Sequence, residues 1–140
     1  MKRVMVAIDG SDYGVTAARA AVEMAEESAS RDVIFVHVVA LKPGQKGTEE
    51  YPERPDLPEK WPVFQEPRAI ASSAGVDVRC EVLFGHAADQ LLHYARREDV
   101  DLIVMGSLGE SGIRDFLLGS VATRVVAHAP CSVMVVRPGF

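Results

Sequence analysis

Glycine and serine residues near the C-terminus have the types and spacing of an anion-binding loop. After the apolar run that ends at Met105, two residues separate Gly106 from Gly109, and nine more lead to Gly119-Ser120, where a helical pattern begins. The free N–H groups and positive dipole end of a helix N-terminus bind phosphate oxygens, and a serine adds a hydroxyl donor. Glycines let the backbone approach such a ligand, although tight packing alone would also explain them. The pattern predicts either a phosphate site or a packing loop.

A carboxylate stands at the end of the first apolar run. The segment AIDGSD places Asp9 directly after this run and Gly10-Ser11 in the turn that follows. Open α/β sheets bind their ligands beyond the carboxyl ends of the strands, where the winding of the sheet reverses. If the first and fourth strands are neighbours, Asp9 faces the glycine loop across one crevice.

Five short runs rich in β-branched residues alternate with helical patterns, at residues 4–8, 33–39, 78–84, 102–105 and 132–136. Four runs are almost continuously apolar, as expected of strands covered on both faces. Charged residues alternate with apolar ones in the third run, as expected of an edge strand. Between the runs, apolar residues recur at the spacing of amphipathic helices. The alternation predicts right-handed βαβ units and a parallel sheet in a single α/β domain over residues 1–140.

Residues 40–67 interrupt this alternation, because six of the eight prolines fall there. Proline removes a backbone donor and breaks helix interiors, so we expect a long loop excursion with at most a short helix after Pro67. Tyr51, Trp61 and Phe64 lie in the same segment. So many aromatic residues favour a surface excursion that packs back onto the domain; a lid over a ligand and a partner-binding patch are the alternatives.

Length and composition predict one soluble, cytoplasmic domain of 140 residues. A net charge of −5 argues against general nucleic-acid binding, but backbone N–H groups can still bind a small anion. Cys80 and Cys131 lie far apart, which favours free thiols in a reducing compartment. No apolar run approaches the ~18 residues of a membrane span, and the N-terminal run is too short for a signal peptide.

Several well-known catalytic and phosphate-binding motifs are missing from the sequence. It contains no G-x-x-x-x-G-K-[ST], no G-x-G-x-x-G and no G-x-S-x-G. The four histidines are scattered, and we expect His37, within a buried strand, to be a satisfied core residue rather than a ligand. We therefore assign no catalytic residue.

The chain resembles the universal stress protein family over nearly its whole length. The resemblance is carried by the segments VMVAIDGSD, VHVV, DLIVMGS and LGSVATRVVAHAPCSVMVVRP. The G-x-x-G, nine residues, G-[ST] pattern is similar to that of the family's ATP-binding branch. This resemblance implies a doubly wound, five-stranded parallel sheet of order 3-2-1-4-5 with helices on both faces, in which the first strand lies beside the fourth.

The resemblance also implies an adenine-nucleotide site. Asp9 resembles the family's aspartate near the ribose and near a phosphate-bound metal ion such as Mg²⁺ or Mn²⁺. Val38 and Val39 match positions whose backbone meets the adenine edge. The other implied binding positions are Ala7, Ile8, Gly106, Gly109, Gly119, Ser120 and Val121.

Three positions depart from the family pattern. Leu108 and Glu110 replace side chains that are often basic or polar in the family, and Ala122 replaces a threonine of some ATP binders. A glutamate near a triphosphate repels it unless it points outward or a divalent ion lies between them.

The sequence thus predicts a non-enzymatic, regulatory stress-response protein that binds ATP, ADP or AMP, with no nucleic-acid or membrane partner. The alternatives are a nucleotide-free dimerisation and interaction module, and a slow Mg²⁺-dependent ATPase in which Asp9 holds the ion. At a sheet edge, the apolar C-terminal segment CSVMVV would offer its unpaired backbone groups to another chain. The family resemblance implies that two such strands pair antiparallel across a two-fold axis, so we expect a homodimer through residues 133–135, with a monomer as the alternative.

Overall fold

Short runs of β-branched and apolar residues form one parallel sheet in the computed structural model of the chain, which describes residues 2–28, 31–41, 57–108 and 118–138. The strands are β1 (Lys2–Ala7), β2 (Arg31–Val39), β3 (Val78–Phe84), β4 (Leu102–Gly106) and β5 (Ser132–Val136). Neighbouring strands are parallel throughout, and their order is β3-β2-β1-β4-β5. The predicted sheet order is confirmed, so β1 and β4 are neighbours.

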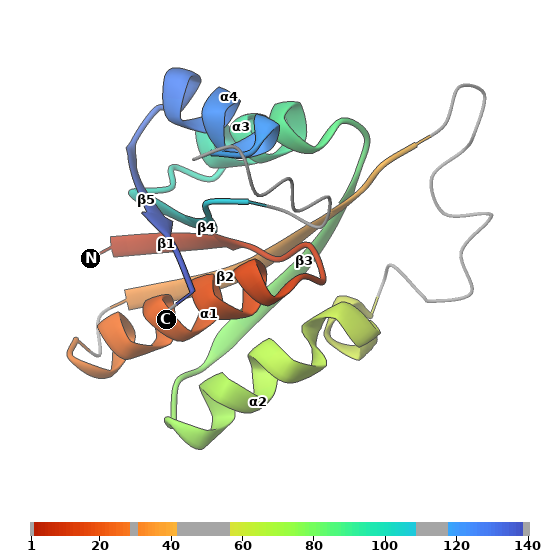
Figure 1. Cartoon of the computed structure of the whole chain (residues 1–140). Coiled ribbons are helices and arrows are strands. Elements are labelled where there is room, and N and C mark those ends of the chain that lie inside the picture. Colours follow the sequence, from red (N-terminus) through yellow and green to blue (C-terminus); the bar gives the residue numbers. More distant parts are fainter. Residues whose placement is uncertain (1, 29–30, 42–56, 109–117, 139–140) are drawn as a thin grey trace.

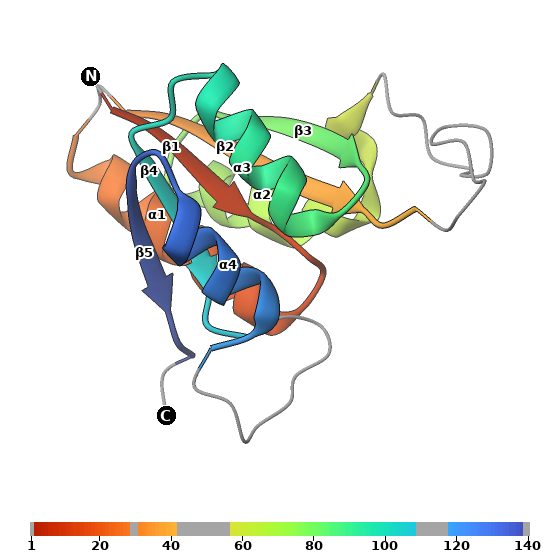
Figure 2. The ribbon, with the colours of Figure 1, turned by 90° about the horizontal axis from the view of Figure 1, so that it is seen from above.

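Helices cover both faces of the sheet (Figure 1). One face carries α1 (Asp12–Glu26) and α2 (Gln65–Ser73), and the other carries α3 (Ala87–Arg97) and α4 (Ser120–His128). Figure 2 shows α3 and α4 side by side above the strands. The doubly wound arrangement expected from the sequence is therefore present.

Side-chain alternation along the strands divides the core into two layers. In β1, Val4 and Val6 pack in the same cluster as Ala18 of α1, whereas Met5 packs in the cluster of Leu91 of α3. Because successive strand residues point to opposite faces, a strand covered on both sides must be apolar throughout. Polar chemistry is consequently confined to the ends of the central strands.

The outermost strand β5 differs from the expectation that both of its faces are covered. Val133 and Val135 pack in the layer of α3 and α4, but Ser132 and Met134 on the other face are exposed, Met134 by 36%. The physical reason is that α1 lies mainly over β1 and β4 and reaches β5 only in part. The other edge strand is β3, as its alternating charges predicted.

The end of the proline-rich segment is helical. Pro58–Lys60 (η1) and Pro62–Phe64 (η2) form single 3₁₀ turns, and α2 then begins at Gln65 rather than after Pro67. Pro67 fits inside the first turn because the N–H groups there have no intrahelical acceptor. The expectation that a helix could only follow Pro67 was therefore wrong by one turn.

Aromatic residues of this segment pack into the core beside α1. Trp61 and Phe64 are both buried in the same cluster as Ala17, which agrees with the packing interpretation. Tyr51 and the rest of residues 42–56 lie outside the described residues.

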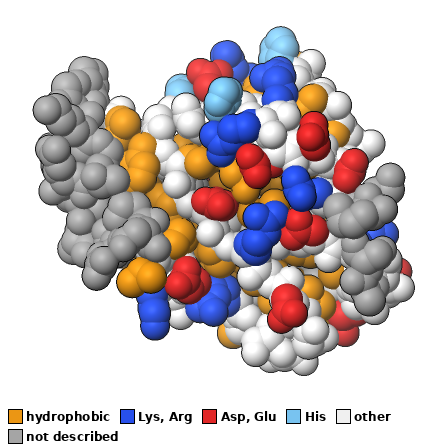
Figure 3. All heavy atoms as spheres, turned by 180° about the vertical axis from the view of Figure 1, so that it is seen from behind, with side chains coloured by type: hydrophobic (Ala, Val, Ile, Leu, Met, Phe, Trp, Pro, Cys, Tyr) orange, Lys and Arg blue, Asp and Glu red, His pale blue; other side chains and the backbone are white. Residues whose placement is uncertain are grey.

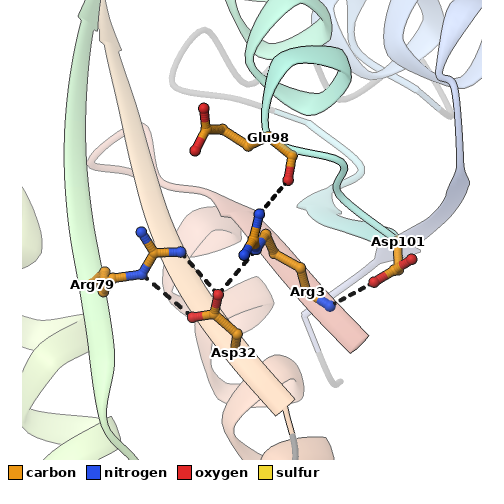
Figure 4. Close-up of polar contacts among 5 residues, drawn as sticks. All are labelled: Arg3, Asp32, Arg79, Glu98 and Asp101. Atoms are coloured by element: carbon orange, nitrogen blue, oxygen red, sulfur yellow. Dashed lines mark hydrogen bonds and ion pairs between the residues drawn. The ribbon is translucent and has the colours of Figure 1, made fainter. Parts of the chain in front are cut away.

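A carboxylate between two guanidinium groups joins three strands at the amino end of the sheet (Figure 4). Asp32 of β2 accepts hydrogen bonds from Arg3 of β1 at 3.0 Å and from Arg79 of β3 at 2.9 Å. Arg3 also donates to the carbonyl of Glu98, and its backbone N–H donates to Asp101. Partial burial alone would raise the pKa of Asp32, but the hydrogen bonds and charges of Arg79 and Arg3 outweigh it and lower this pKa.

Acidic and basic side chains are interspersed over the face shown in Figure 3, and histidines gather toward the end where α3 and α4 lie. Arg124 of α4 pairs there with Asp89 of α3 at 2.8 Å. Within the described ranges, no helix has both the length and the apolar character needed to cross a bilayer.

We expect Asp32→Asn to lower the free energy of unfolding at neutral pH by about 0.5–1 kcal/mol, the size of a partly solvent-screened ion pair. A pKa lowered by folding stabilises the protein above the unfolded-state pKa, and this stabilisation is lost as the pH falls through the folded-state pKa. Urea denaturation should thus show a difference between wild type and variant that shrinks from about pH 7 to about pH 3. Asp77→Asn, at an exposed aspartate before β3, is the matched control and should change little. A difference independent of pH would contradict the assigned role of Asp32.

Candidate functional site

A cavity of about 410 Å³ opens at the carboxyl ends of β1, β2 and β4. It lies where the strand order reverses between β1 and β4, which is where open α/β sheets bind ligands, and its size suits a small organic ligand. The predicted site residues that the structure describes all line it: Ala7, Ile8, Asp9, Val38, Val39, Gly106, Gly119, Ser120 and Val121. Gly109 lies outside the described residues.

Sequence reasoning did not assign several other lining residues to the site. They are Gly14, Val36, His37, Ala40, Ala87, Leu91 and Met105, and the two departures from the family pattern that the structure describes, Leu108 and Ala122, also line the cavity. Most are apolar, and helix or strand periodicity marks such residues as core without showing which of them border a cavity.

The turn after β1 holds the Asp9 carboxylate in one orientation. Oδ1 of Asp9 accepts hydrogen bonds from the N–H of Ser11 at 3.0 Å and from its hydroxyl at 2.6 Å. The Ser11 hydroxyl in turn accepts from the N–H of Gly14 at 3.4 Å and so caps α1. Within the described residues Oδ2 of Asp9 has no hydrogen-bond partner, so it can accept from a ligand hydroxyl or bind a cation.

Two glycines make room for this turn. Gly10 has φ +92°, a backbone conformation that residues with a side chain rarely adopt. A Cβ atom at Gly14 would lie 3.0 Å from Oδ1 of Asp9 and 3.2 Å from its backbone nitrogen. The missing side chain at Gly14 therefore allows α1 to begin directly against the carboxylate.

The N-terminus of α4 presents free N–H groups on the opposite side of the cavity. The N–H of Gly119, the N-cap residue, donates to the carbonyl of Ser107 at 2.7 Å, which joins the start of α4 to the end of β4. Within the described residues no side chain caps this helix, and the N–H groups of Ser120, Val121 and Ala122 have no backbone acceptor. These donors and the helix dipole suit an anionic group.

Packing against α1 requires a glycine at position 106. A Cβ atom there would lie 2.5 Å from Cβ of Tyr13 and 3.0 Å from the carbonyl carbon and oxygen of Tyr13. Real Cβ atoms do not approach other atoms so closely, so a larger residue would push α1 away from β4. The packing interpretation of the glycine pattern thus holds for Gly106, which also lines the cavity.

The backbone of Val38 is available on the cavity side because β1 ends early. Pairing of β1 with β2 stops at Ala7 and Val36, whereas β2 pairs with β3 as far as Val39. The carbonyl of Val39 accepts from the N–H of Gly85 on the β3 side at 2.9 Å. Since alternate residues of a parallel strand bond to opposite neighbours, the N–H and C=O of Val38 face the side where β1 has ended. They form one donor and one acceptor side by side.

His37 is hydrogen-bonded, as expected, but it is only half-buried and borders the cavity. Its Nδ1 lies 2.7 Å from the carbonyl oxygen of Ile8. The expectation of a satisfied histidine is confirmed, whereas its placement wholly within the core was wrong. The reason is that this end of β2 borders the cavity, where Val38 and Val39 are also only half-buried.

The cavity has few charged groups. Among its described lining residues Asp9 is the one carboxylate, and there is no lysine or arginine. No three described His, Cys, Asp or Glu residues are grouped to hold a metal ion. Arg124 pairs with Asp89 outside the cavity, and Arg114 and Glu110 lie outside the described residues. A divalent ion here would need ligand oxygens in addition to Asp9.

Family-model, sequence and structure comparisons all match this chain to the same family of proteins. A family model described as the universal stress protein family matches residues 1–137. A universal stress protein of Methanocaldococcus jannaschii is 33% identical, over 97% of this chain and 82% of its own length. The universal stress protein YxiE of Bacillus subtilis is 32% identical, over 96% of this chain and 98% of its own. A crystal structure of a universal stress protein in complex with cAMP superposes with a TM-score of 0.71 at 26% identity, covering 96% of this chain and 95% of that one.

Proposed function

This chain belongs to the universal stress protein family, and we propose that its cavity binds an adenine nucleotide, namely ATP, ADP or AMP. The observation that carries the proposal is that three ligand-binding features border one cavity: the Val38 backbone edge, the Asp9 carboxylate and the N-terminus of α4. A universal stress protein that is 26% identical to this chain has been crystallised with cAMP, which contains adenine, ribose and phosphate.

The Val38 edge has the hydrogen-bonding pattern that adenine requires. Its N–H can donate to a ring nitrogen of the base, and its C=O can accept from the exocyclic amino group. Guanine and hypoxanthine present an acceptor and a ring N–H in the reverse order, so neither pairs with this edge in the orientation that adenine takes. Ala87, Leu91 and Val39 supply apolar surface around the base.

The other two features suit the sugar and the phosphate. Oδ2 of Asp9 can accept from a ribose hydroxyl, while the N–H groups of α4 and the Ser120 hydroxyl can donate to phosphate oxygens. If the nucleotide carries Mg²⁺ or Mn²⁺, Asp9 is the described residue that would hold the ion, because these ions prefer oxygen ligands. Residues 109–117, which include Gly109, lie outside the described residues, and the proposal therefore covers one to three phosphates.

We propose a regulatory role in a stress response, exerted in the cytoplasm through nucleotide occupancy. Both cysteines are free, which suits a reducing compartment, and burial raises the pKa of Cys80 to about 11, so that its thiol stays protonated. In a nucleotide-free interaction module, the unpaired backbone groups that border the cavity would have no ligand to hydrogen-bond. A slow Mg²⁺-dependent ATPase would use the same site, with Asp9 as the ion ligand.

We expect Ser120→Pro to weaken binding of AMP and ATP by at least about tenfold, because it removes two donors and the loss of one hydrogen bond to a charged group already has an effect of this size. Ser120 is the first residue of α4 and follows Gly119 in an extended conformation, a position that proline occupies without disturbing a helix. The substitution removes one N–H and one hydroxyl. Isothermal titration calorimetry measures the change in Kd.

The matched control for this experiment is Ser120→Ala, which removes the hydroxyl and keeps the N–H. It should lose less affinity than Ser120→Pro, and neither variant should change the weaker binding of adenosine, which has no phosphate. Equal nucleotide affinity of the proline variant and wild type would exclude the N-terminus of α4 as the phosphate site.

We expect ATP hydrolysis far below the median enzyme turnover of about 10 s⁻¹. Oδ1 of Asp9 already accepts two hydrogen bonds from Ser11, and the described lining residues offer no cationic side chain to a developing phosphate charge. A phosphate-release assay with Mg²⁺ measures the rate. Turnover near the median value that disappears in Asp9→Asn would show an enzyme instead.

We further propose a homodimer through β5. Among the described residues, this strand pairs with β4 alone, and Met134 is one of three exposed large hydrophobic side chains. An unpaired apolar edge favours pairing with a second copy, and an antiparallel pair across a two-fold axis closes at two subunits.

We expect Met134→Lys to convert this dimer to a monomer, because two ammonium groups would then face each other across the two-fold axis. Sedimentation velocity of wild type and variant over a range of concentrations measures the change in mass. Met134→Leu keeps the apolar edge and should remain dimeric. A wild type that stays monomeric at high concentration would refute the dimer.

A further inference from the structure

We propose that His37 is a positioning residue for the adenine base, because its Nδ1–H occupies the Ile8 carbonyl and thereby keeps the Val38 N–H free for the ligand. The inference rests on the proposed function and extends it to a residue that does not itself need to touch the nucleotide. It follows from the hydrogen bonds at the point where β1 and β2 separate.

In an uninterrupted parallel ladder, the bond from Ile8 N–H to the carbonyl of Val36 would be followed by one from Val38 N–H to the carbonyl of Ile8. The first bond is present at 2.8 Å. The second is absent from the described backbone bonds, and the Ile8 carbonyl instead faces Nδ1 of His37 at 2.7 Å. The imidazole thus replaces the next bond of the ladder.

The hydrogen bond between His37 and the Ile8 carbonyl determines which ring nitrogen of His37 carries a proton. A carbonyl oxygen can only accept, so Nδ1 must carry a proton in both the neutral and the charged form of the ring. Ile8 is a buried residue, 3% exposed, and a buried carbonyl without a donor is costly. His37 therefore satisfies a group that would otherwise draw Val38 back toward β1.

Two aromatic side chains hold the ring of His37 in place. Its centroid lies 6.3 Å from that of Trp61 and 6.4 Å from that of Phe64, the latter edge-on at 86°. Both partners are buried, Trp61 at 5% and Phe64 at 0% exposure. The end of the proline-rich segment thus orients a residue that borders the cavity, which gives its aromatic residues a role beyond packing.

Loss of the Nδ1–H donor has a selective consequence. The Val38 N–H would then donate to the Ile8 carbonyl. This N–H, which we assign to adenine, would no longer be available to the ligand. The N-terminus of α4, on the other side of the cavity, would be unchanged. Base discrimination should therefore fall while phosphate binding persists, whereas a general loss of stability would weaken all nucleotides alike.

The test compares His37→Asn with His37→Leu, two side chains of similar shape of which only asparagine can donate from the position of Nδ1. Calorimetry measures Kd for AMP and for inosine monophosphate, which differ at the base edge. We expect wild type and His37→Asn to prefer AMP, and His37→Leu to bind AMP about tenfold more weakly with little preference left between the two nucleotides. Amide hydrogen exchange in the free proteins should show slower exchange of the Val38 N–H in His37→Leu than in wild type.

The outcomes separate the two proposals. A wild type that binds neither nucleotide overturns the proposed function and this inference together. A wild type that prefers AMP, with His37→Leu showing the same preference, overturns the role of His37 alone. Should the leucine variant not fold, nitrogen NMR of wild-type His37 decides: protonated Nδ1 supports the role, and a neutral ring protonated only at Nε2 overturns it.

Discussion

The Val38 backbone edge and the Asp9 carboxylate, which we assign to the base and the ribose, are available because β1 is shorter than β2 and β4 at the carboxyl end of the sheet. Backbone groups inside a parallel sheet are consumed by its ladders, and the side chains of covered strands are apolar. Where β1 stops, one strand edge on β2 loses its partner, and the chain turns into Asp9. The hydrogen bond between His37 and Ile8 marks the point at which pairing ends.

The opposite wall is built by a different constraint. Gly106 allows β4 to approach α1 at a distance that no Cβ atom tolerates, and the bond from Gly119 to Ser107 brings the start of α4 to the end of β4. One wall therefore offers a neutral donor and acceptor pair, and the other offers helix-end donors that favour negative charge. A ligand with a heteroaromatic base at one end and an anion at the other satisfies both.

Much of this arrangement was predictable from the sequence, for physical reasons. Covered parallel strands must be apolar, so their positions are visible as apolar runs, and the glycine and serine spacing locates the start of α4. His37 was missed because its role depends on a contact with Ile8 of a neighbouring strand, which periodicity does not show. The start of α2 was missed because a proline penalty applies to helix interiors, and Pro67 lies in a first turn. The packing requirement for a glycine at position 106 was not predictable, because it comes from contact with Tyr13, which is distant in the sequence.

The most direct measurement of the central claim is an NMR titration of the ¹⁵N-labelled protein with AMP. Our account predicts that the backbone N–H signals of Val38, Ser120 and Val121 move together with one affinity, because one ligand contacts both walls. Signals of the outer surface of α3, such as His93, should stay in place. Shifts confined to that outer surface, or movement of the α4 signals without Val38, would contradict the account.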